Sequence, residues 1–375
     1  MSDYLPSEIH AEIMKRLPVK SLMQFRSVSK TWKSLIDSSD FIADYSRQHT
    51  QPQHLLVKYA DDPHTFEEKY VSYIDDDTFP EQKVSQTVHL SVEYHNIMGY
   101  SHGVLCLYDG HDEDSGRVVL WNVSIKKSVA VVVPNVAKSG SIYKTVLGFG
   151  VCCETSDPKI VKVTQMSRWS DIINIPRQVE VFTLSTGVWR SPYSNNLPRK
   201  SIQFRHYQEV VDGCLYWLAT DRIVMGGGFR PYNLIISFDM ASEEFREVKL
   251  PDSLARLSRY NLTMSKRRES LVLLERDVET ANNPLFVVWV MEDGVPKSFS
   301  KVFTINTPHA SIVSGFRKSG EPIIEVRELE EDERAQLVVY EPYSKHTDNL
   351  AIDGMYYFVY PYMDSLLLLN QPNGN

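Results

Sequence analysis

The chain has 375 residues, of which 42% are apolar and 23% are charged, and its formal net charge is −8 at pH 7. Such a composition is typical of a globular protein, and the length is sufficient for one large domain and a small one. General binding to nucleic acid or to an anionic membrane needs a basic surface, so we expect neither partner.

The first residues, "MSDYLPSEIH", contain two acids and lack a basic stretch followed by an apolar one. No run reaches the about 18 apolar residues of a membrane span. We therefore expect a protein of the cytoplasm or the nucleus. The four cysteines, Cys106, Cys152, Cys153 and Cys214, lie in or beside apolar runs without C-x-x-C spacing, which predicts reduced core residues.

The N-terminal segment has helical periodicity. Leu5, Ile9, Ile13 and Leu17 recur every four residues, and the pattern stops at Pro18. This spacing places the four side chains on one face and predicts an amphipathic helix.

Three further short helical elements are expected after it. Pro18 suits the first turn of a second helix. Ser27 is positioned to cap a third helix, on which apolar side chains recur from Val28 to Ile36, and Ser39 is positioned to cap a last turn. A helical unit this short rarely buries so many apolar side chains by itself. They must pack either on a partner or on the domain that follows.

The string "LPSEIHAEIMKRLPVKSLMQFRSVSKTWKSLI" resembles the F-box at nearly every diagnostic position, including the Leu-Pro opening, "LPVKSL" and "FRSVSKTW". In that family the motif docks a Skp-family adaptor, which connects it to a cullin scaffold. The resemblance implies an F-box over residues 1–45 and a second domain over 46–375. It marks as adaptor-binding candidates Leu5, Pro6, Ile9, Ile13, Leu17, Pro18, Leu22, Val28 and Trp32.

Some of these candidates must face the adaptor and others the core of the F-box itself, and the sequence does not sort the two groups. The basic Lys20, Arg26, Lys30 and Lys33 fit two interpretations. They could speed association with an acidic adaptor, or they could form a solvated face, which is the commoner role of such residues.

From His54 onward, short alternating or wholly apolar runs are separated by Gly, Pro, Asn and Asp, which predicts an all-β domain. One pattern recurs: an apolar run that ends in an aromatic residue, a polar turn and a second strand. The aromatic residues follow one another at intervals of 51 to 61 residues, close to the length of a kelch-type propeller blade; they are Trp121, Phe182, Phe238, Trp289 and Tyr340.

Another strand is expected before each hairpin, in "GVLCLYD", "KTVLGFGVCC", "GCLYWLA", "SLVLLER" and "PIIEVRE". The runs "HLLVKY" and "MYYFVYPYM", near the two ends of the chain, could complete one blade jointly and close a ring. We expect a β-propeller-like fold of six blades, plus or minus one, with a two-sheet sandwich as the alternative. The paired glycines usual in kelch repeats are absent.

The β segment also resembles a known family. "SHGVLCL", "VEVFTLSTGVWR", "VVDGCLYWLA" and "IISFDMASEEFREVKLP" are similar to the F-box-associated domain of plant F-box proteins, over roughly residues 95 to 310. The resemblance implies a substrate receptor of a Skp–cullin–F-box ubiquitin ligase that recruits a protein target for degradation. That family includes the S-locus F-box proteins of pollen self-incompatibility, and the residues do not separate this subgroup from its paralogues.

Motifs for catalysis are missing. The histidines are scattered, His95 and His102 being the closest plausible pair, and H-E-x-x-H, G-x-S-x-G and phosphate-loop patterns do not occur. The carboxylates in "YIDDD" and "GHDEDSG" favour solvated loops over weak calcium sites. We expect a non-catalytic protein without metal or cofactor.

Three long or unusual loops are candidates for substrate contact, at 108–117, 165–178 and 221–233, because loops on a strand scaffold tolerate variation. Residues typical of interface anchors within them are Arg168, Trp169, Phe229, Arg230 and Tyr232. The acidic "YDGHDEDSG" favours a basic partner. Two alternative functions stay open: an F-box protein with a non-degradative scaffold role, and a carbohydrate-binding or hydrolytic propeller with a helical cap.

Overall fold

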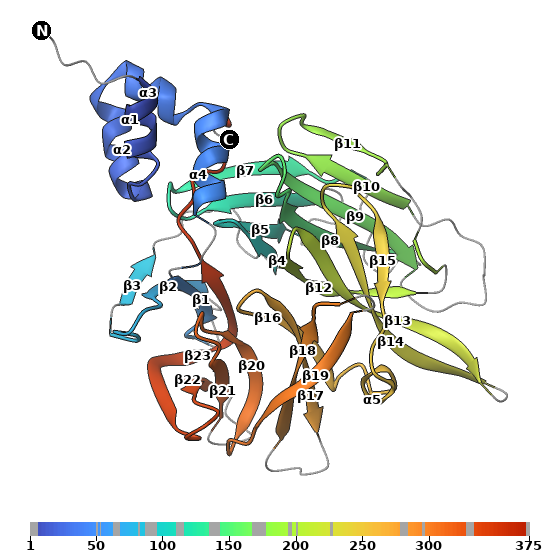
Figure 1. The fold of residues 1–375 in the computed structure, drawn as a ribbon. Helices are drawn as coiled ribbons and strands as arrows, with labels where there is room; N and C mark the ends of the chain where they lie inside the picture. Colours follow the sequence, from blue (N-terminus) through green and yellow to red (C-terminus); the bar gives the residue numbers. More distant parts are fainter. Residues whose placement is uncertain are drawn as a thin grey trace, which may run out of the picture.

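The computed structural model describes most of the chain, in several ranges. They are residues 7–49, 52, 54–62, 68–81, 83–86, 96–109, 116–134, 143–166, 178–193, 197–199, 202–225, 228–277, 284–294, 297–327 and 334–372. A group of helices at the N-terminus stands on one side of an assembly of β-sheets (Figure 1). This arrangement confirms the expected fold class, a small all-α F-box segment followed by a β-propeller-like domain.

The helical segment consists of α1 (Ser7–Met14), α2 (Val19–Val28), α3 (Lys30–Ile36) and α4 (Ser39–Gln48). Two of the expected caps were wrong by one or two residues. The Ser29 hydroxyl, not that of Ser27, caps α3 by accepting from the Trp32 N–H at 3.1 Å. Ser27 instead donates to the Gln24 carbonyl within α2, which continues to Val28. Ser38, not Ser39, caps α4.

The described strands form five antiparallel sheets. Four of them have four strands each, and in each of these sheets neighbouring strands also follow one another in the chain. The first sheet contains β4 (Asn96–Ser101), β5 (Val104–Asp109), β6 (Arg117–Asn122) and β7 (Lys127–Val132). The second contains β8 (Tyr143–Val151), β9 (Pro158–Met166), β10 (Gln178–Thr183) and β11 (Val188–Arg190). The third contains β12 (Gln203–Val211), β13 (Cys214–Met225), β14 (Gly228–Asp239) and β15 (Phe245–Val248), and the short helix α5 (Asp252–Ala255) follows it. The fourth contains β16 (Leu262–Arg267), β17 (Ser270–Asp277), β18 (Leu285–Glu292) and β19 (Ser298–Ile305).

The fifth sheet joins the two ends of the chain. Its seven strands run in the order β20 (Ala310–Phe316), β21 (Pro322–Val326), β22 (Ala335–Tyr340), β23 (Thr347–Tyr362), β1 (His54–Ala60), β2 (Glu68–Ile74) and β3 (Lys83–Gln86). The long β23 pairs with β22 through its first half and with β1 through its second. Two four-stranded units therefore share β23, and the predicted pairing of the runs near both ends is confirmed.

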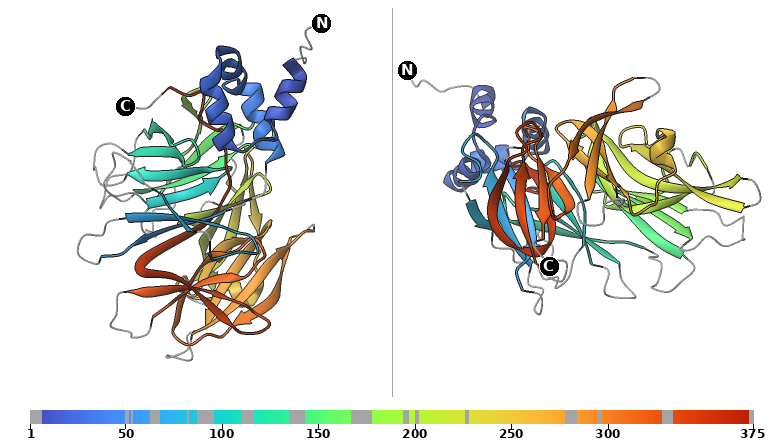
Figure 2. Two further views of the ribbon diagram at one scale, coloured as in Figure 1. Left: turned by 90° about the vertical axis from the view of Figure 1, so that its left-hand side faces the viewer. Right: turned by 90° about the horizontal axis from the view of Figure 1, so that it is seen from below.

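The first strand of each sheet lies at the centre of the ring. β4 contacts β8 and β12, β12 contacts β16, and β16 contacts β20. Tyr100 on β4 and Tyr360 on β23 complete the circle, with ring centroids 6.4 Å apart. The second view of Figure 2 shows the sheets fanning out from this centre. The structure has five sheets, a number within the expected range of six blades plus or minus one. The alternative of a two-sheet sandwich is excluded.

The repeat found in the sequence corresponds to a fixed place in each sheet. The five recurring aromatic residues lie on the third strand of successive units, β6, β10, β14, β18 and β22. The strand expected before each hairpin is the second strand of its sheet, except that "KTVLGFGVCC" is the first strand of the second sheet and β9, which follows it, was missed. The first strands of the other sheets, β4, β12, β16 and β20, were also not among the expected runs. The sequence of β9, "PKIVKVTQM", alternates apolar with basic or polar residues, which is the signal that could have found it.

Cysteine burial differs from expectation at two positions. Cys106 and Cys152 are buried, but Cys153 is exposed and Cys214 is half-buried, and all four are free thiols. Cys153 follows β8 and begins the turn to β9, so its side chain leaves the core although the residue adjoins an apolar strand.

Candidate protein-interaction surfaces

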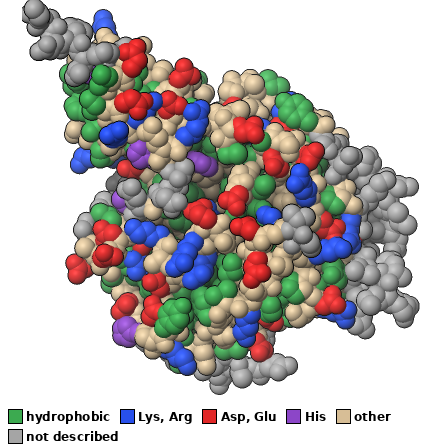
Figure 3. Space-filling model, viewed as in Figure 1, with side chains coloured by type: hydrophobic (Ala, Val, Ile, Leu, Met, Phe, Trp, Pro, Cys, Tyr) green, Lys and Arg blue, Asp and Glu red, His purple; other side chains and the backbone are tan. Residues whose placement is uncertain are grey.

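The first candidate surface is apolar and lies on the N-terminal helices. Ile9 and Ile13 on α1 are 44% and 50% exposed, and Val28 at the end of α2 is 67% exposed. Figure 3 shows hydrophobic side chains gathered on the outer side of the helical segment, at the upper left of the molecule. Beside Ile9 and Ile13 is a hollow of about 310 Å³, whose described lining also includes Glu8, Glu12 and Arg16.

The structure separates the adaptor-binding candidates that the sequence left mixed. Leu22 is fully buried in the core, whereas Leu17 and Trp32 are half-buried and pack against it. Trp32 meets the Phe25 ring edge-on, with centroids 5.2 Å apart. Pro18 is exposed, like Ile9, Ile13 and Val28. The remaining candidates, Leu5 and Pro6, lie outside the described residues.

Among the basic residues of this segment, Arg26 differs from the other three. Its guanidinium holds Asp37 through two hydrogen bonds, of which Nη2 to Oδ2 measures 2.9 Å, and the hydrogen bond to Asp37 raises the pKa of Arg26. Arg26 thus ties α2 to the end of α3. Lys20, Lys30 and Lys33 are exposed and remain available for an acidic partner.

The helices are joined to the sheets by one continuous core. Apolar side chains from α1 to α4 share a cluster with the first two sheets and with the segment that follows β23. Leu366 is fully buried in this cluster, and Leu367, Leu368 and Leu369 are nearly so. The C-terminal segment therefore lies between the F-box helices and the propeller, as the first view of Figure 2 shows.

Hydrogen bonds hold this C-terminal segment in place. The Asn122 amide donates to the carbonyls of Ser365 (3.0 Å) and Leu367 (2.8 Å), and the Lys127 ammonium donates to the Leu369 carbonyl at 2.9 Å. On the helical side, Asn370 Nδ2 donates to the Ser39 hydroxyl at 3.2 Å. Both ends of the contact are thus hydrogen-bonded, which fixes the orientation of the F-box relative to the ring.

A buried tyrosine strengthens the helical side of this contact. Tyr45 on α4 is 1% exposed, and its hydroxyl donates to the Leu17 carbonyl at 3.1 Å. Burial raises the pKa of Tyr45, and the charge of Asp364 in the C-terminal segment raises it further, so the phenol stays protonated at physiological pH and keeps its donor.

The second candidate surface is the opposite face of the ring. The three predicted contact loops connect the second strand of a sheet to its third: β5 to β6, β9 to β10 and β13 to β14. Because these connections are equivalent in the sheets, they leave the ring on one face. The C-terminal segment contacts the β4–β5 and β6–β7 turns, which belong to the other face. The described strand ends that flank the candidate loops therefore lie on the ring face away from the F-box.

The predicted anchor residues are placed only in part. Arg168 and Trp169 lie outside the described residues. Phe229 and Arg230 belong to the β13–β14 hairpin, where they pair with Val224 and Ile223, and their side chains are not described. Tyr232 is half-buried and packs against the apolar cluster between the third and fourth sheets.

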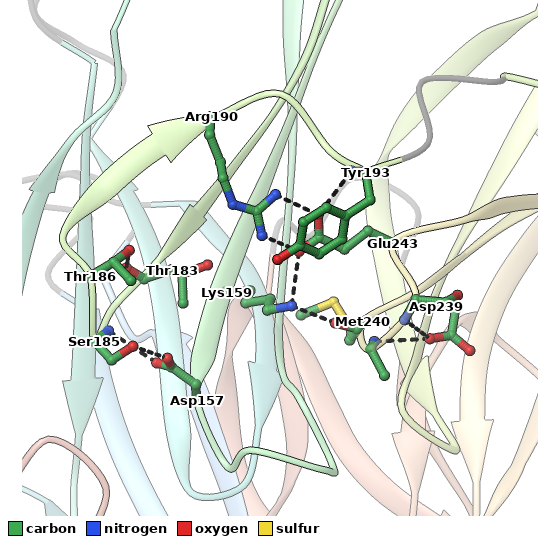
Figure 4. Close-up of polar contacts among 12 residues, drawn as sticks. Asp157, Lys159, Thr183, Ser185, Thr186, Arg190, Tyr193, Asp239, Met240 and Glu243 are labelled. Atoms are coloured by element: carbon green, nitrogen blue, oxygen red, sulfur yellow. Dashed lines mark hydrogen bonds and ion pairs between the residues drawn. The ribbon is translucent and has the colours of Figure 1, made fainter.

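A charged network joins the second and third sheets (Figure 4). Glu243, in the β14–β15 turn, is fully buried; it accepts from Lys159 Nζ at 2.9 Å and from Arg190 Nη1 and Nη2 at 2.7 and 2.6 Å. Lys159 also donates to the Met240 carbonyl at 2.7 Å. Burial alone would raise the pKa of Glu243, but the hydrogen bonds from Arg190 and Lys159 outweigh it and lower that pKa. Each of the three charged groups thus has an oppositely charged partner, and the network ties the second sheet to the third.

No group of three or more His, Cys, Asp or Glu side chains suited to a metal ion occurs in the described ranges. His102 lies in the β4–β5 turn, while His95 is not among the described residues. Asp75 of "YIDDD" is 2% exposed and accepts from Arg317 Nε at 2.8 Å and from the Lys318 N–H at 2.7 Å. Within the part of the chain that is described, no helix is long and apolar enough to cross a membrane.

A helical module with exposed apolar side chains, fused to a ring of antiparallel sheets, is the architecture of F-box proteins with a propeller domain. Comparisons agree: the F-box domain matches residues 3–44, and the F-box associated beta propeller domain matches residues 55–368. The chain belongs to the family of F-box proteins with an F-box associated beta propeller domain. This architecture fits a substrate receptor, and the F-box implies binding of a Skp1-type adaptor.

Similar curated proteins come from Arabidopsis thaliana. F-box protein At3g07870 is 26% identical over 322 residues, covering 81% of this chain and 73% of that protein. F-box/kelch-repeat protein At3g23880 is also 26% identical, over 321 residues, covering 80% and 79%. Among solved structures, a mutant of Aleuria aurantia lectin aligns with 9% identity and a TM-score of 0.41, covering 81% of this chain and 96% of the lectin. This structural similarity is too low to support an argument.

Proposed function

We propose that this protein is the substrate-receptor subunit of a Skp–cullin–F-box ubiquitin ligase. Its F-box binds the Skp-family adaptor, and the loop face of its propeller binds a protein that is then ubiquitylated and degraded. The chain itself performs no chemistry in this proposal. It acts by proximity, since a target held beside the conjugating enzyme reacts at a high effective concentration.

The observation that carries the proposal is the exposure of Ile9, Ile13 and Val28 on a module whose other large apolar side chains are mostly buried or half-buried. Burying a Val or Ile side chain fully contributes about 1.5 to 3 kcal/mol. Since the three side chains are 44%, 50% and 67% exposed, covering the rest of them would contribute on the order of 2 to 5 kcal/mol in total. This offsets part of the roughly 4 to 15 kcal/mol that association costs. The exposed Lys20, Lys30 and Lys33 would speed binding to an acidic adaptor.

The rigid seat of the F-box supports the proximity mechanism. A receptor must hold its target at a reproducible distance from the conjugating enzyme, and the shared core with the C-terminal segment fixes this geometry. The strand ends that flank the candidate loops lie on the ring face away from the F-box, so adaptor and target would bind without competing for one surface. We place the complex in the cytoplasm or the nucleus.

Calorimetric titration with a purified Skp-family adaptor tests the proposal. We expect the wild-type chain to bind with submicromolar affinity and the double variant Ile9→Asp, Ile13→Asp to lose binding. Val302→Asp is the matched control, because Val302 is a comparably exposed apolar residue (48%) on β19, far from the helices in the sequence. Absence of adaptor binding by the folded wild-type chain would refute the proposal.

A second assay separates a degradative receptor from a scaffold. In a ligase reconstituted from adaptor, cullin and conjugating enzyme, a receptor transfers ubiquitin to proteins captured by its propeller. A scaffold forms the same adaptor complex, but its bound partner remains unmodified and stable in cells.

A further inference from the structure

The centre of the loop face carries basic groups from three neighbouring sheets. They are Lys144 at the start of β8, Arg205 and His206 near the start of β12, and Arg259 just before β16. Arg205 and Arg259 are in direct contact, because Arg205 Nη1 donates to the Arg259 carbonyl at 2.9 Å. These strand starts lie on the ring face away from the F-box, as do the described strand ends that flank the candidate loops.

A bulge in the innermost strand presents two of these residues. The register of β12 against β13 shifts between Phe204 and Gln208, so that three residues of β12 lie opposite one residue of β13. Extra residues in a strand re-aim their side chains. Within the bulge, His206 is exposed and Tyr207 is 67% exposed, although both lie on a central strand.

Local hydrogen bonds hold Arg205 rigidly. Besides Arg259, it donates from Nη1 to the Leu262 carbonyl at 2.7 Å and from Nη2 to Asn233 Oδ1 at 2.9 Å. These acceptors are neutral, and the buried Nε has no hydrogen-bond partner among the described residues. The cluster thus contains a preorganised guanidinium whose charge is not neutralised within the described part of the chain.

The basic groups act on one another. Burial and the neighbouring charge of Arg259 lower the pKa of Lys144, and burial and the same charge lower the pKa of Arg205 to about 10. Burial, Lys144 and Arg259 lower the pKa of His206. In the described ranges none of the four makes an ion pair with a carboxylate, unlike Arg190 on β11 and Arg199 in the segment before β12. Such mutual repulsion is relieved by a bound anion.

Aromatic side chains flank the cluster. Tyr260 is 78% exposed, and the Arg259 guanidinium lies 5.4 Å from its ring centroid, while Tyr207 projects from the bulge. Exposed tyrosines beside arginines are typical of protein-binding surfaces, since each offers apolar area together with a hydrogen-bonding group.

We propose that Lys144, Arg205, His206 and Arg259 form the centre of a docking site for an acidic segment of a protein partner, with Tyr207 and Tyr260 packing beside it. This inference rests on the proposed receptor function and predicts that the target protein presents an acidic segment. It differs from the basic partner that the acidic sequence at 108–117 suggests, but residues 110–115 of that sequence are outside the described residues, whereas the cluster is carried by the innermost strands.

Fluorescence anisotropy with short labelled peptides tests the site on the full-length protein. The probes are a Glu–Gly peptide, a phosphoserine–Gly peptide and a neutral Gln–Gly peptide of equal length. We expect the two acidic peptides to bind, the neutral one not to bind, and affinity to fall with rising salt. The acidic peptide that binds more tightly shows whether the site prefers carboxylate or phosphate.

The test variant is Lys144→Gln with Arg259→Gln, because neither side chain makes an ion pair or hydrogen bond in the described structure. We expect at least about a tenfold loss of affinity for the acidic peptide. The matched control, Lys249→Gln with Lys301→Gln, removes two exposed charges elsewhere and should bind as the wild type does. Equal loss in both variants would overturn the proposal, as would tighter binding of a single-stranded RNA of equal charge.

The same variants separate this inference from the receptor function. Both double variants should bind the Skp-family adaptor with unchanged affinity, because all four substitutions lie outside the F-box. Failure of the peptide to bind while adaptor binding persists would overturn the acidic docking site alone. Failure of the wild-type chain to bind the adaptor would overturn the receptor function itself.

Discussion

Asn122 on β6 donates its side-chain amide to the main-chain carbonyl of Leu367 at 2.8 Å, which joins the first sheet to the C-terminal end of the chain. Both residues are buried, and the Leu367 side chain lies in the cluster that also contains the F-box helices. A single amide therefore stabilises the contact through which the F-box is seated.

Asn122→Ala should lower the free energy of unfolding by about 1 to 3 kcal/mol, because two buried carbonyls lose their donor. Chemical denaturation measures the change. Asn349→Ala is the control: Asn349 is exposed and also donates a side-chain hydrogen bond, so its loss should have little effect. Equal destabilisation by both variants would contradict the role given to Asn122.

Leu22 and Val28 lie on the same helix, and their substitutions should have opposite consequences. Leu22→Ala should destabilise the protein by about 2 to 5 kcal/mol, because the side chain is fully buried. Val28→Ala should leave stability nearly unchanged and weaken adaptor binding, because the side chain is 67% exposed. Thermal unfolding and calorimetric titration separate the two effects. A stability loss confined to Val28→Ala would refute this division.

Glu243→Gln should cost about 3 to 5 kcal/mol, because it leaves Lys159 buried without its counter-ion. Chemical denaturation at neutral pH measures this cost. Asp157→Asn is a useful comparison, since Asp157 accepts from Ser185 in the exposed turn of the same sheet.

The stabilisation by Glu243 should also depend on pH. Its pKa in the folded protein is below the ordinary value of 4.5, so the stabilisation is complete above that value and is lost as the pH falls through the lower, folded pKa. The stability difference between wild type and Glu243→Gln should therefore shrink in acid. A difference that grew as the pH fell would contradict the ion-pair assignment.

Gly148 on β8 should tolerate no side chain. A Cβ there would lie 2.2 Å from Trp217 Cζ2 and 2.7 Å from Gln208 Oε1, so Gly148→Ala should destabilise by about 1 to 3 kcal/mol or more. Gly187→Ala is the comparison, since nothing lies within 4 Å of its Cβ position and only its φ of +67° is unfavourable. Thermal unfolding should show the larger loss at Gly148.

Local patterns in the sequence were sufficient to predict the class of fold. The four-residue spacing of Ile9, Ile13 and Leu17 predicted a helix, and the aromatic residues from Trp121 to Tyr340 marked the third strand of each unit. Helix caps were less predictable. Ser27 and Ser29 have the same chemistry, and Ser29 caps α3 because α2 continues to Val28.

What the sequence determined by itself was the class of fold, the helical segment, the repeated hairpins and the family, because periodicity and motif spacing act over short stretches of chain. Only the tertiary structure decided that Leu22 is buried while Ile9, Ile13 and Val28 are exposed, since burial depends on which surfaces meet. The same holds for the seat of the F-box on Leu366 and for the contact of Arg205 with Arg259. These contacts join residues that no local pattern relates, and the closure of the ring brings them together.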